Sequence, residues 1–392
     1  MSVDCRILRT IVALLALVAA PAHSAERPLD DMLVPYLARY ELPALAAAAV
    51  KNGVIVASGA VGTRRHGTQT PVTVDDRFHI GSDTKAMTAL LCGMFIEEGK
   101  LRWTSTIGEV FPEFTDMDAG LRQVTLEQLL SHTSGMQSDN EAFGDLLGKV
   151  MFQSGNLDEM RYWLVREWSS QPLQSAPGSA FVYSNLGYTI AGAMLERVSG
   201  KTWEELMTER IFIPLGLESA GFGPQSSVGK IDAPLAHAVV DGRIKPLLAG
   251  PNSDNPLVIG PAGLAHLSVR DFARWAGWNA GQGKRGPALV AAATLKKLHT
   301  PVVAMPAKTD AEAGTRSQRG YGLGWVQLSV GWAPHPIYYH GGSNGYNLAH
   351  IWLDPQHDVA MVVMTNIAGK QTNEALLDIA ARLYAQLAGD TP

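Results

Sequence analysis

The amino-acid sequence predicts an α/β (α+β) fold, in which an antiparallel sheet built from both chain ends is flanked by helices and carries an inserted, mainly helical region. Near the N-terminus, the apolar runs Leu45–Val50 and Val54–Val61 are separated by Lys51-Asn52-Gly53, and Asn-Gly between such runs is a strong hairpin signal. Near the C-terminus, three further runs are typical of consecutive antiparallel strands: 337–340, 348–353 and 359–364. Since strands occur near both ends and helices dominate the middle, we expect one sheet and not two domains in series.

Helical patterns account for most of the remaining chain. Residues 27–41 and 373–387 predict one helix near each end. The helices predicted between them are 86–99, 124–130, 157–168, 186–198, 203–211, 269–280 and 288–298. By contrast, Gly221–Gly263 is rich in Gly, Pro and Ser with little periodicity, which predicts a long irregular region, and Ala307–Arg319 is a polar stretch.

These patterns and the composition favour a single globular domain over residues 25–392. Its α/β part is expected at about 27–85 and 320–388, and its helical part at about 86–319. Hydrophobic residues make up 46% and charged residues 18% of the chain, which is typical of a globular enzyme. The formal net charge of −5 provides no basic patch and argues against nucleic-acid binding.

Residues 1–24 have the features of a secretory signal peptide. Arg6 and Arg9 precede the apolar run Ile11–Ala20, and Ala22-His23-Ser24 places small residues at the −3 and −1 positions of a cleavage site. Because this run has ten residues and a membrane span needs about 20, a signal is favoured over an N-terminal anchor. The mature protein is therefore expected to be exported, periplasmic or secreted, with no stable membrane span. It would keep one cysteine, Cys92, which lies in an apolar helix and is expected to be a core residue.

The segment Ser82-Asp83-Thr84-Lys85 places a serine and a lysine at the start of the apolar helix 86–99. Three residues make nearly one helical turn, so the Ser82 hydroxyl and the Lys85 ammonium should lie on the same face. Ser82 would sit at the positive end of the helix dipole, which favours negative charge on its oxygen. A lysine among apolar side chains has its pKa lowered by desolvation, so that its neutral form can accept the serine proton. This is the Ser-Lys form of an activated nucleophile.

A second S-x-x-K copy, Ser227–Lys230, lies in the Gly/Pro/Ser-rich region and is followed by Ile231-Asp232-Ala233-Pro234, which cannot begin a long helix. We interpret this second copy as a surface loop. The first copy precedes a segment that is apolar nearly all round, as in a buried helix. Its alternative interpretation is a capping serine followed by a lysine whose ammonium reaches solvent.

Two further short motifs follow the first copy in order: Tyr183-Ser184-Asn185 and His340-Gly341-Gly342-Ser343. The three together resemble the serine β-lactamase and penicillin-binding-protein superfamily, whose elements are S-x-x-K, Y-x-N or S-D-N, and K-T-G or H-x-G. The resemblance covers roughly residues 30 to 385. Four flanking stretches agree with it: 130–135, Pro177-Gly178, 214–217 and 261–263.

The Y-x-N form resembles the branch of class C β-lactamases, D-aminopeptidases, some DD-carboxypeptidases and related esterases, and this likeness assigns the site residues. It implies Ser82 as nucleophile, Lys85 as its base or proton partner, and Tyr183 as the group that passes the proton to the leaving group. Asn185 would orient Lys85 and the acyl amide, and the backbone N–H groups of Ser82 and Ser343 would form the oxyanion hole. The resemblance implies a small-molecule or peptide substrate, no metal and no organic cofactor.

The third motif departs from the β-lactamase pattern. No K-T-G occurs, and His340 and Gly341 stand where β-lactamases carry lysine and threonine, while Gly342 keeps the glycine. An imidazole is only partly charged near neutral pH, so a permanent cation and a hydroxyl for a β-lactam carboxylate are both lost. The sequence therefore favours an esterase or D-amino-acid-type peptidase. A β-lactamase or DD-carboxypeptidase is the first alternative, since some DD-peptidases use H-x-G, and a non-catalytic cell-wall or protein-binding module is the second.

Three rival sites are weaker. Gly341–Gly345 fits the G-x-S-x-G nucleophile elbow, but that elbow needs a strand-to-helix turn, and a strand is predicted here. A zinc hydrolase is disfavoured because the eleven histidines are scattered and H-E-x-x-H is absent. His132, in the turn after the helix 124–130, is expected to be a structural histidine bonded to loop backbone.

Overall fold

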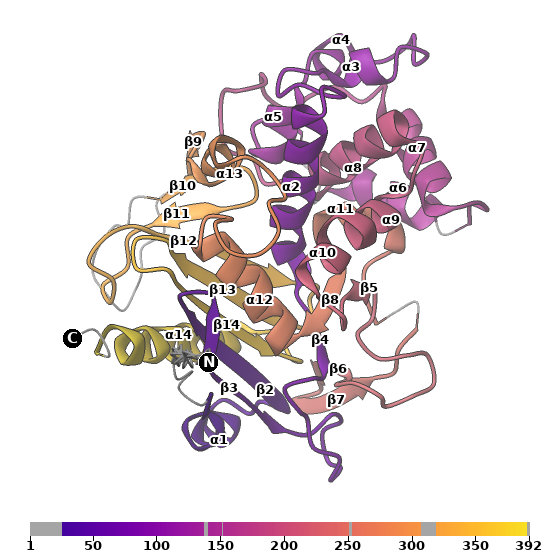
Figure 1. Cartoon of the computed structure of the whole chain (residues 1–392). Helices are drawn as coiled ribbons and strands as arrows, with labels where there is room; N and C mark the ends of the chain where they lie inside the picture. Colours follow the sequence, from indigo (N-terminus) through magenta and orange to yellow (C-terminus); the bar gives the residue numbers. More distant parts are fainter. Residues whose placement is uncertain (1–25, 137–139, 151, 251–252, 307–318, 390–392) are drawn as a thin grey trace, which may run out of the picture.

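The computed structural model describes residues 26–136, 140–150, 152–250, 253–306 and 319–389 (Figure 1). Its large sheet has the order β1-β3-β2-β14-β13-β12-β11-β10-β9. The N-terminal strand β2 (Ala44–Lys51) pairs antiparallel with the C-terminal strand β14 (Val359–Thr365), with Ala48 opposite Val362. The predicted α/β fold, with one sheet built from both ends of the chain, is therefore confirmed.

The other strands of this sheet extend from that central pair. The N-terminal side holds β3 (Val54–Gly62) and β1 (Arg27–Pro28). The C-terminal side holds β13 (Leu348–Asp354), β12 (Ile337–Ser343), β11 (Val326–Leu328), β10 (Arg319–Tyr321) and β9 (Val303–Ala304). Asn52 and Gly53 turn between β2 and β3 with φ of 55° and 76°, the left-handed conformation that an Asn-Gly hairpin turn requires.

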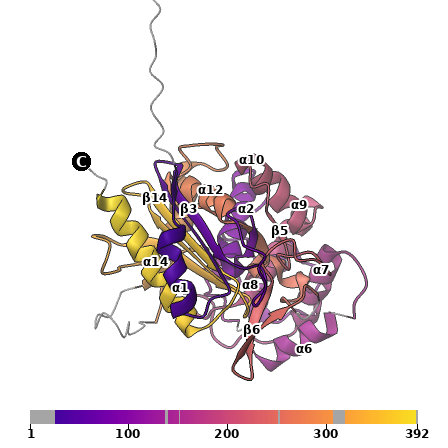
Figure 2. The same ribbon diagram turned by 90° about the horizontal axis from the view of Figure 1, so that it is seen from below.

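Helices cover both faces of the sheet (Figure 2). The helices α1 (Asp30–Arg39) and α14 (Lys370–Gly389) lie on one face, and α12 (Val269–Ala280) packs on the other. Strand β2 is buried on both sides because its residues alternate between the two cores: Leu45 and Ala47 pack with α1 and α14, whereas Ala46 and Ala48 belong to the larger core. The range 86–319, predicted as the helical part, therefore also supplies a helix to the sheet layer.

The helical region is organised around α2 (Thr84–Glu97), whose residues from Thr84 to Phe95 are all buried. Cys92 lies inside this helix, fully buried as predicted, and burial raises the pKa of its thiol above the usual range. The surrounding helices are α3 (Ile107–Val110), α4 (Ala119–Arg122), α5 (Leu126–Leu130), α6 (Glu141–Val150), α7 (Leu157–Trp168), α8 (Asn185–Ser199), α9 (Trp203–Met207), α10 (Ile213–Leu215), α11 (Gly260–Gly263) and α13 (Ala292–His299). Short 3-10 or π turns lie at Gly81–Asp83 (η1), Thr208–Phe212 (η2) and Leu257–Ile259 (η3).

A small antiparallel sheet connects the two regions next to Ser82. It has the order β4-β8-β5, with β4 (Arg77–His79), β8 (Ala265–Ser268) and β5 (Gly221–Phe222). Because β4 leads into η1 and α11 leads into β8, the pairing of these strands brings α11 beside the start of α2.

The prediction of an irregular region over Gly221–Gly263 is wrong in part. This range contains a hairpin of β6 (Ala236–Val240) and β7 (Arg243–Leu247), besides η3 and α11. Asp241 and Gly242 turn between the strands with φ of 52° and 69°. Asp-Gly is a hairpin signal of the same kind as Asn-Gly. The predicted signal peptide, residues 1–24, and residues 307–318 of the polar stretch lie outside the described residues.

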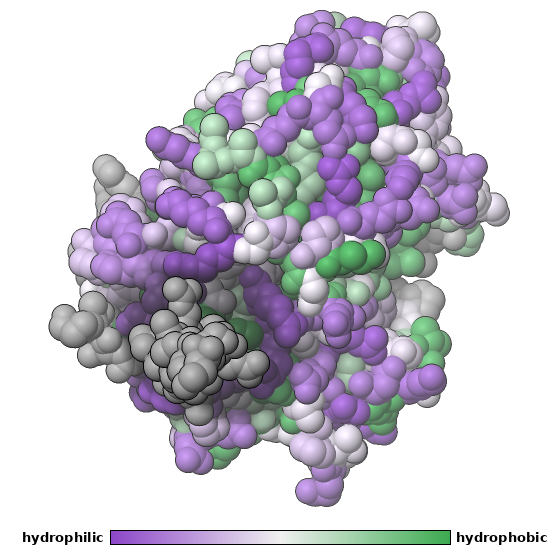
Figure 3. Space-filling view, in the orientation of Figure 1, coloured by the Kyte–Doolittle hydropathy of each residue, from purple (hydrophilic) through white to green (hydrophobic). Residues whose placement is uncertain are grey.

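The surface in the view of Figure 1 is mostly hydrophilic, with smaller apolar areas between the polar ones (Figure 3). None of the helices among the described residues combines the length and apolar character needed to cross a membrane.

Candidate active site

Ser82 lies in η1, where the chain leaves β4 and enters α2. Gly81 has φ of +51°, and a Cβ added there would lie only 2.3 Å from the backbone nitrogen of Ser343. A glycine is therefore required on both conformational and steric grounds. The consequence is that the serine turn lies directly against the end of β12.

Lys85 is fully buried one turn after Ser82. Its Nζ donates hydrogen bonds to Oγ of Ser82 at 3.0 Å, to Oδ1 of Asn185 at 2.8 Å and to the carbonyl oxygen of Ala262 at 2.6 Å. The Nζ atom also lies 4.7 Å from the centre of the Tyr183 ring. The alternative of a lysine that reaches solvent is therefore wrong for this copy of the motif.

Tyr183 contacts the same serine oxygen from the other side. Its hydroxyl donates to Oγ of Ser82 at 2.7 Å. The next residue, Ser184, caps α8 by accepting a hydrogen bond from the Gly187 N–H, which places Asn185 in the first helical turn. The three predicted motif residues Lys85, Tyr183 and Asn185 thus meet around Ser82, and the serine proton can pass to whichever of the lysine amine and the phenol oxygen is deprotonated.

His132 supports this arrangement from behind Tyr183. Among the described residues, no hydrogen bond joins His132 to Ser82 itself. Its Nδ1 accepts the N–H of Ser184 at 3.0 Å, and its ring centre lies 4.2 Å from that of Tyr183. Burial and the nearby Lys85 charge hold the pKa of His132 well below its ordinary value. The predicted structural role, a histidine bonded to loop backbone, agrees with this geometry.

The end of β12 lies against the serine turn. A Cβ added to Gly342 would lie 1.8 Å from the carbonyl oxygen of Ile80 and 2.7 Å from the nitrogen of Ser82, so no side chain fits there. The Ser343 hydroxyl donates to the Asn347 carbonyl at 2.7 Å, and it accepts the Gly345 N–H at 3.0 Å. The side chain of Ser343 therefore braces its own turn, and its backbone lies beside Ser82.

A polar network that the sequence analysis missed ties this strand end to the serine turn. Asn344 donates from Nδ2 to Oδ1 of Asp254 at 2.9 Å, and Oδ2 of Asp254 lies 3.1 Å from Nε2 of His79. The other ring nitrogen of His79 accepts the Gly81 N–H at 3.0 Å. Burial acts against the charged form, but the neighbouring His79 and the Asn344 amide hold the pKa of Asp254 below its ordinary value. His79 precedes the motif that begins at Ser82, and Asn344 follows the motif that ends at Ser343. Their positions beside these motifs were the signal from which the network could have been predicted.

His340 is buried, with 4% of its surface exposed. Its Nε2 lies 3.1 Å from the Tyr321 hydroxyl, and its Nδ1 lies 3.4 Å from the Asp83 carboxyl group. Burial and the charge of Lys85 lower the pKa of His340 to about 3. The prediction of a partly charged imidazole near neutral pH is therefore wrong. Burial also raises the pKa of Asp83 well above its ordinary value, against the effect of Lys85.

Ser82 opens into a cavity of about 240 Å³. Asn185, Gly263 and Ser343 line it together with α6, which contributes Phe143 and Leu147. A neighbouring, largely apolar cavity of about 440 Å³ shares Asn255 with it and is lined by Val150, Leu157, Met160 and Val258 among others. Ser82 therefore faces a space lined by both polar and apolar residues, and a larger, mostly apolar space adjoins it.

Comparison with known proteins agrees with this geometry. A model of the Beta-lactamase family matches residues 29–386. The chain belongs to the β-lactamase family. The resemblance stated from the motifs is therefore confirmed, and so is the enzyme class: the protein is a serine hydrolase. Ser343 ends a strand and is followed by β13, which excludes the rival nucleophile elbow.

Two known proteins with different names are similar to the chain over different lengths. The chain is 26% identical over 333 residues to "Penicillin-binding protein 4" of Amycolatopsis lactamdurans. This alignment covers 84% of this chain and 82% of that protein. It is 31% identical over 189 residues to "Lovastatin esterase" of Penicillium rubens. This alignment covers 44% of this chain and 47%, about half, of the esterase.

Solved structures share the fold. The octameric penicillin-binding protein homologue from Pyrococcus abyssi has a TM-score of 0.73 at 23% identity, covering 92% of this chain and 77% of that one. The hydrolase EstCE1 has a TM-score of 0.72 at 20% identity, covering 90% and 97%. A D-stereospecific amidohydrolase from Streptomyces sp. has a TM-score of 0.66 at 21% identity, covering 86% and 94%.

Proposed function

We propose that the protein is an exported hydrolase that cleaves an ester or a D-amino-acid-type amide through an acyl-enzyme on Ser82. The observation that carries the proposal is the position of the Ser82 oxygen, which contacts Nζ of Lys85 and the Tyr183 hydroxyl while His340 stands nearby as a neutral imidazole. The contacts with Lys85 and Tyr183 supply a proton acceptor for Ser82. The neutral imidazole of His340 bears on which substrates fit the site.

The reaction follows from these contacts in two steps. The Lys85–Tyr183 pair accepts the Ser82 proton as Oγ attacks the substrate carbonyl, and the resulting oxyanion is stabilised by the backbone N–H groups of Ser82 and Ser343. Tyr183 then passes a proton to the leaving alcohol or amine as its bond to the carbonyl carbon breaks. In the second step, a water molecule gives its proton to the same pair and attacks the acyl-enzyme. The acid is released and Ser82 recovers its proton.

The geometry of β12 favours substrates without the carboxylate of a β-lactam. His340 is neutral near pH 7, so it does not supply the charge of the lysine in K-T-G. A Cβ added to Gly341 would lie 2.2 Å from the Tyr339 hydroxyl, so a threonine side chain has no room there unless Tyr339 moves. The adjoining apolar cavity suits a bulky apolar acyl or leaving group. The names of two relatives, an esterase and a D-stereospecific amidohydrolase, point in the same direction.

The decisive experiment compares the kcat/KM of the mature protein for a chromogenic short-chain ester and for a chromogenic cephalosporin. We expect the ester to be preferred by several orders of magnitude, and D-amino-acid amides are then the next substrates to test. Equal or faster cephalosporin turnover would replace this proposal with the alternative of a β-lactamase, and release of a terminal D-alanine with the alternative of a DD-carboxypeptidase.

Two serine variants control this comparison. Ser82→Ala should remove turnover, whereas Ser227→Ala, in the second S-x-x-K copy, should leave it unchanged. Persistence of ester turnover in Ser82→Ala would refute the acyl-enzyme on Ser82. Absence of turnover in the wild type, with a biological effect retained by Ser82→Ala, would support a non-catalytic binding module.

Export is part of the proposal and is supported by the signal-like sequence of residues 1–24. Expression in a bacterial host followed by cell fractionation and N-terminal sequencing tests it. We expect a mature protein that begins at Ala25, found outside the cytoplasm. A full-length chain that begins at Met1 and stays in the cytoplasm would contradict export while leaving the catalytic proposal intact.

A further inference from the structure

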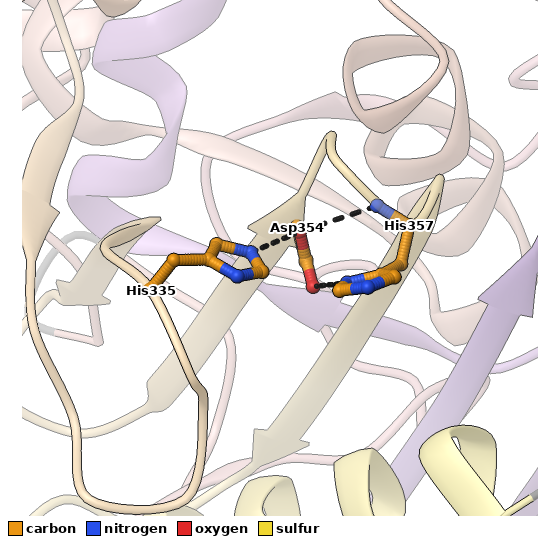
Figure 4. Close-up of side chains that lie close together, drawn as sticks. All are labelled: His335, Asp354 and His357. Carbon is orange, nitrogen blue, oxygen red and sulfur yellow. Dashed lines mark hydrogen bonds and ion pairs between the residues drawn. The ribbon is translucent and has the colours of Figure 1, made fainter.

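Two histidines and one aspartate form a cluster at the end of β13 that is remote from Ser82 (Figure 4). Asp354 ends β13, His357 lies in the turn that leads to β14, and His335 comes from the loop before β12. Ser343, next to Ser82, pairs with Leu348 at the other end of β13. Asp354 is six residues further along, so at about 3.3 Å per residue the cluster lies roughly 20 Å from that end.

The two imidazoles contact different oxygens of one buried carboxylate. Nε2 of His335 lies 2.8 Å from Oδ1 of Asp354, and Nδ1 of His357 lies 2.7 Å from Oδ2. The side chain of Asp354 is 1% exposed, that of His335 15% and that of His357 53%. In Figure 4 the rings flank the carboxylate from either side. Three atoms that commonly bind metals therefore converge at a place that solvent reaches from the His357 side.

Further hydrogen bonds fix the carboxylate in this orientation. The Tyr384 hydroxyl, from α14, donates to Oδ2 of Asp354 at 2.8 Å, and the N–H of Gln356 donates to Oδ1 at 3.1 Å. Hydrogen bonds from outside the ligand set are what hold metal-binding carboxylates and imidazoles in place. The cluster is thus held rigidly by four segments: the loop before β12, the end of β13, the turn after it, and α14.

We propose that His335, Asp354 and His357 bind a divalent transition-metal ion, with zinc as the best fit. Two imidazole nitrogens and one carboxylate oxygen are typical zinc ligands, whereas calcium and magnesium prefer oxygen alone. In a tetrahedral site with bonds of about 2.0–2.2 Å, ligand atoms are about 3.3–3.6 Å apart. The ligand atoms here all lie within 4.8 Å of one another, so small side-chain movements are sufficient. A water molecule from the exposed side of His357 completes the coordination.

Zinc would be held by the lone pairs of Nε2 of His335 and Nδ1 of His357, so each bound ring would carry its N–H on the other nitrogen. The direct contacts of the two imidazoles with Asp354 are then replaced by coordination of all three side chains to the ion. Because the ion then connects the segments that meet at this end of the sheet, its effect is on stability, at a distance from the chemistry at Ser82.

The test is a zinc titration of tag-free mature protein that has been treated with EDTA and dialysed. Calorimetry should show one zinc ion per chain, and Tm should rise by about 3–4 °C at a zinc concentration 100 times the Kd. The double variant with His335→Ala and His357→Ala should lose both effects. The matched control His66→Ala, which changes an exposed histidine in another loop, should keep both. If the double variant does not fold, His357→Ala alone takes its place, because that side chain is half exposed.

Three results would overturn the proposal. The first is a wild-type protein that shows no calorimetric binding of zinc. The second is a variant that folds and binds zinc with the wild-type stoichiometry and Kd. The third is an equal rise in Tm with calcium, because a site with two imidazoles should discriminate against that ion. Separately, ester turnover of the wild type should change less than twofold on zinc binding, and a larger change would refute a purely structural role for the ion.

Discussion

The chain contains the S-x-x-K spacing twice, and the two copies have different surroundings. In the first, Lys85 is fully buried at the start of α2, with Nζ 3.0 Å from Oγ of Ser82. In the second, the Ser227 hydroxyl donates to the Asp232 carboxylate at 2.6 Å, and Lys230 is exposed in a turn. The same spacing therefore yields a lysine–serine contact in one place and a serine–aspartate contact in the other.

An aspartate beside each copy shows the physical basis of the difference. Asp83, inside the first copy, is buried, and burial raises its pKa well above the ordinary value. Asp232, beside the second, is partly exposed. Although burial acts in the opposite direction, hydrogen bonds from Ser227 and the charge of Arg77 lower the pKa of Asp232 to about 2. Removal from water, and not the spacing of residues, distinguishes the first copy from the second.

The largest expected effect separates the two lysines. Lys85→Ala should lower kcat/KM for an ester by at least about 10³-fold, because Ser82 loses its proton partner. The matched control Lys230→Ala should change kcat/KM by less than twofold. Steady-state kinetics on both variants measures this difference, with circular dichroism to confirm folding. Wild-type rates in Lys85→Ala would show that the two copies do not differ in function.

The next effect concerns the second group at the Ser82 oxygen. Tyr183→Phe removes the hydroxyl that lies 2.7 Å from Oγ and should lower kcat by roughly 10²–10³-fold, the usual size of a general acid–base contribution. The loss should be greater for an alkyl ester than for a nitrophenyl ester, since a poor leaving group needs the proton more. Tyr162→Phe, at a partly exposed tyrosine in α7, is the control. An equal loss for both esters would contradict a role in leaving-group protonation.

Close backbone packing is a further property of the first copy, and Gly342→Ala tests it. The added methyl group would collide with the Ile80 carbonyl oxygen and displace β12 from the nitrogen of Ser82. We expect kcat to fall by roughly 10²-fold through the oxyanion hole, and Tm to fall by about 1–4 °C. Gly331→Ala, where an added Cβ meets no atom within 4 Å, should change neither. A normal kcat in Gly342→Ala would place the oxyanion elsewhere.

The smallest effect is a difference in pH dependence between the two aspartates. A raised pKa stabilises the fold below the unfolded-state value near 3.8, and this contribution is lost as pH rises, so Asp83→Asn should gain stability relative to wild type between pH 4 and pH 8. A lowered pKa works in the opposite direction, and Asp232→Asn should lose a small amount of stability above pH 4. Urea unfolding at several pH values measures both. Parallel pH profiles for the two variants would contradict the assigned environments.

Features that depend on neighbouring residues were predicted more successfully than features that depend on burial or on distant residues. Helices such as α7 and α12 were predicted with their observed bounds, because their apolar periodicity is a local property. The hairpin of β6 and β7 was missed because its strands are partly exposed and Pro246 lies within β7, so that alternation was lost although Asp241-Gly242 marked the turn. The charge of His340 was misjudged because the pKa of an imidazole depends on burial, which no local pattern reveals.

The sequence by itself determined the order of the three motifs, the helix behind Ser82 and the pairing of strands from both ends of the chain. The tertiary structure alone decided that Lys85 is buried against the Ala262 carbonyl, 177 residues away, and that Asp254 connects Asn344 to His79 beside the serine turn. It also brought His335 to Asp354 and His357. The reason is that periodicity and turn signals act between neighbouring residues, whereas desolvation and the pairing of polar groups depend on distant segments that meet only in the folded protein.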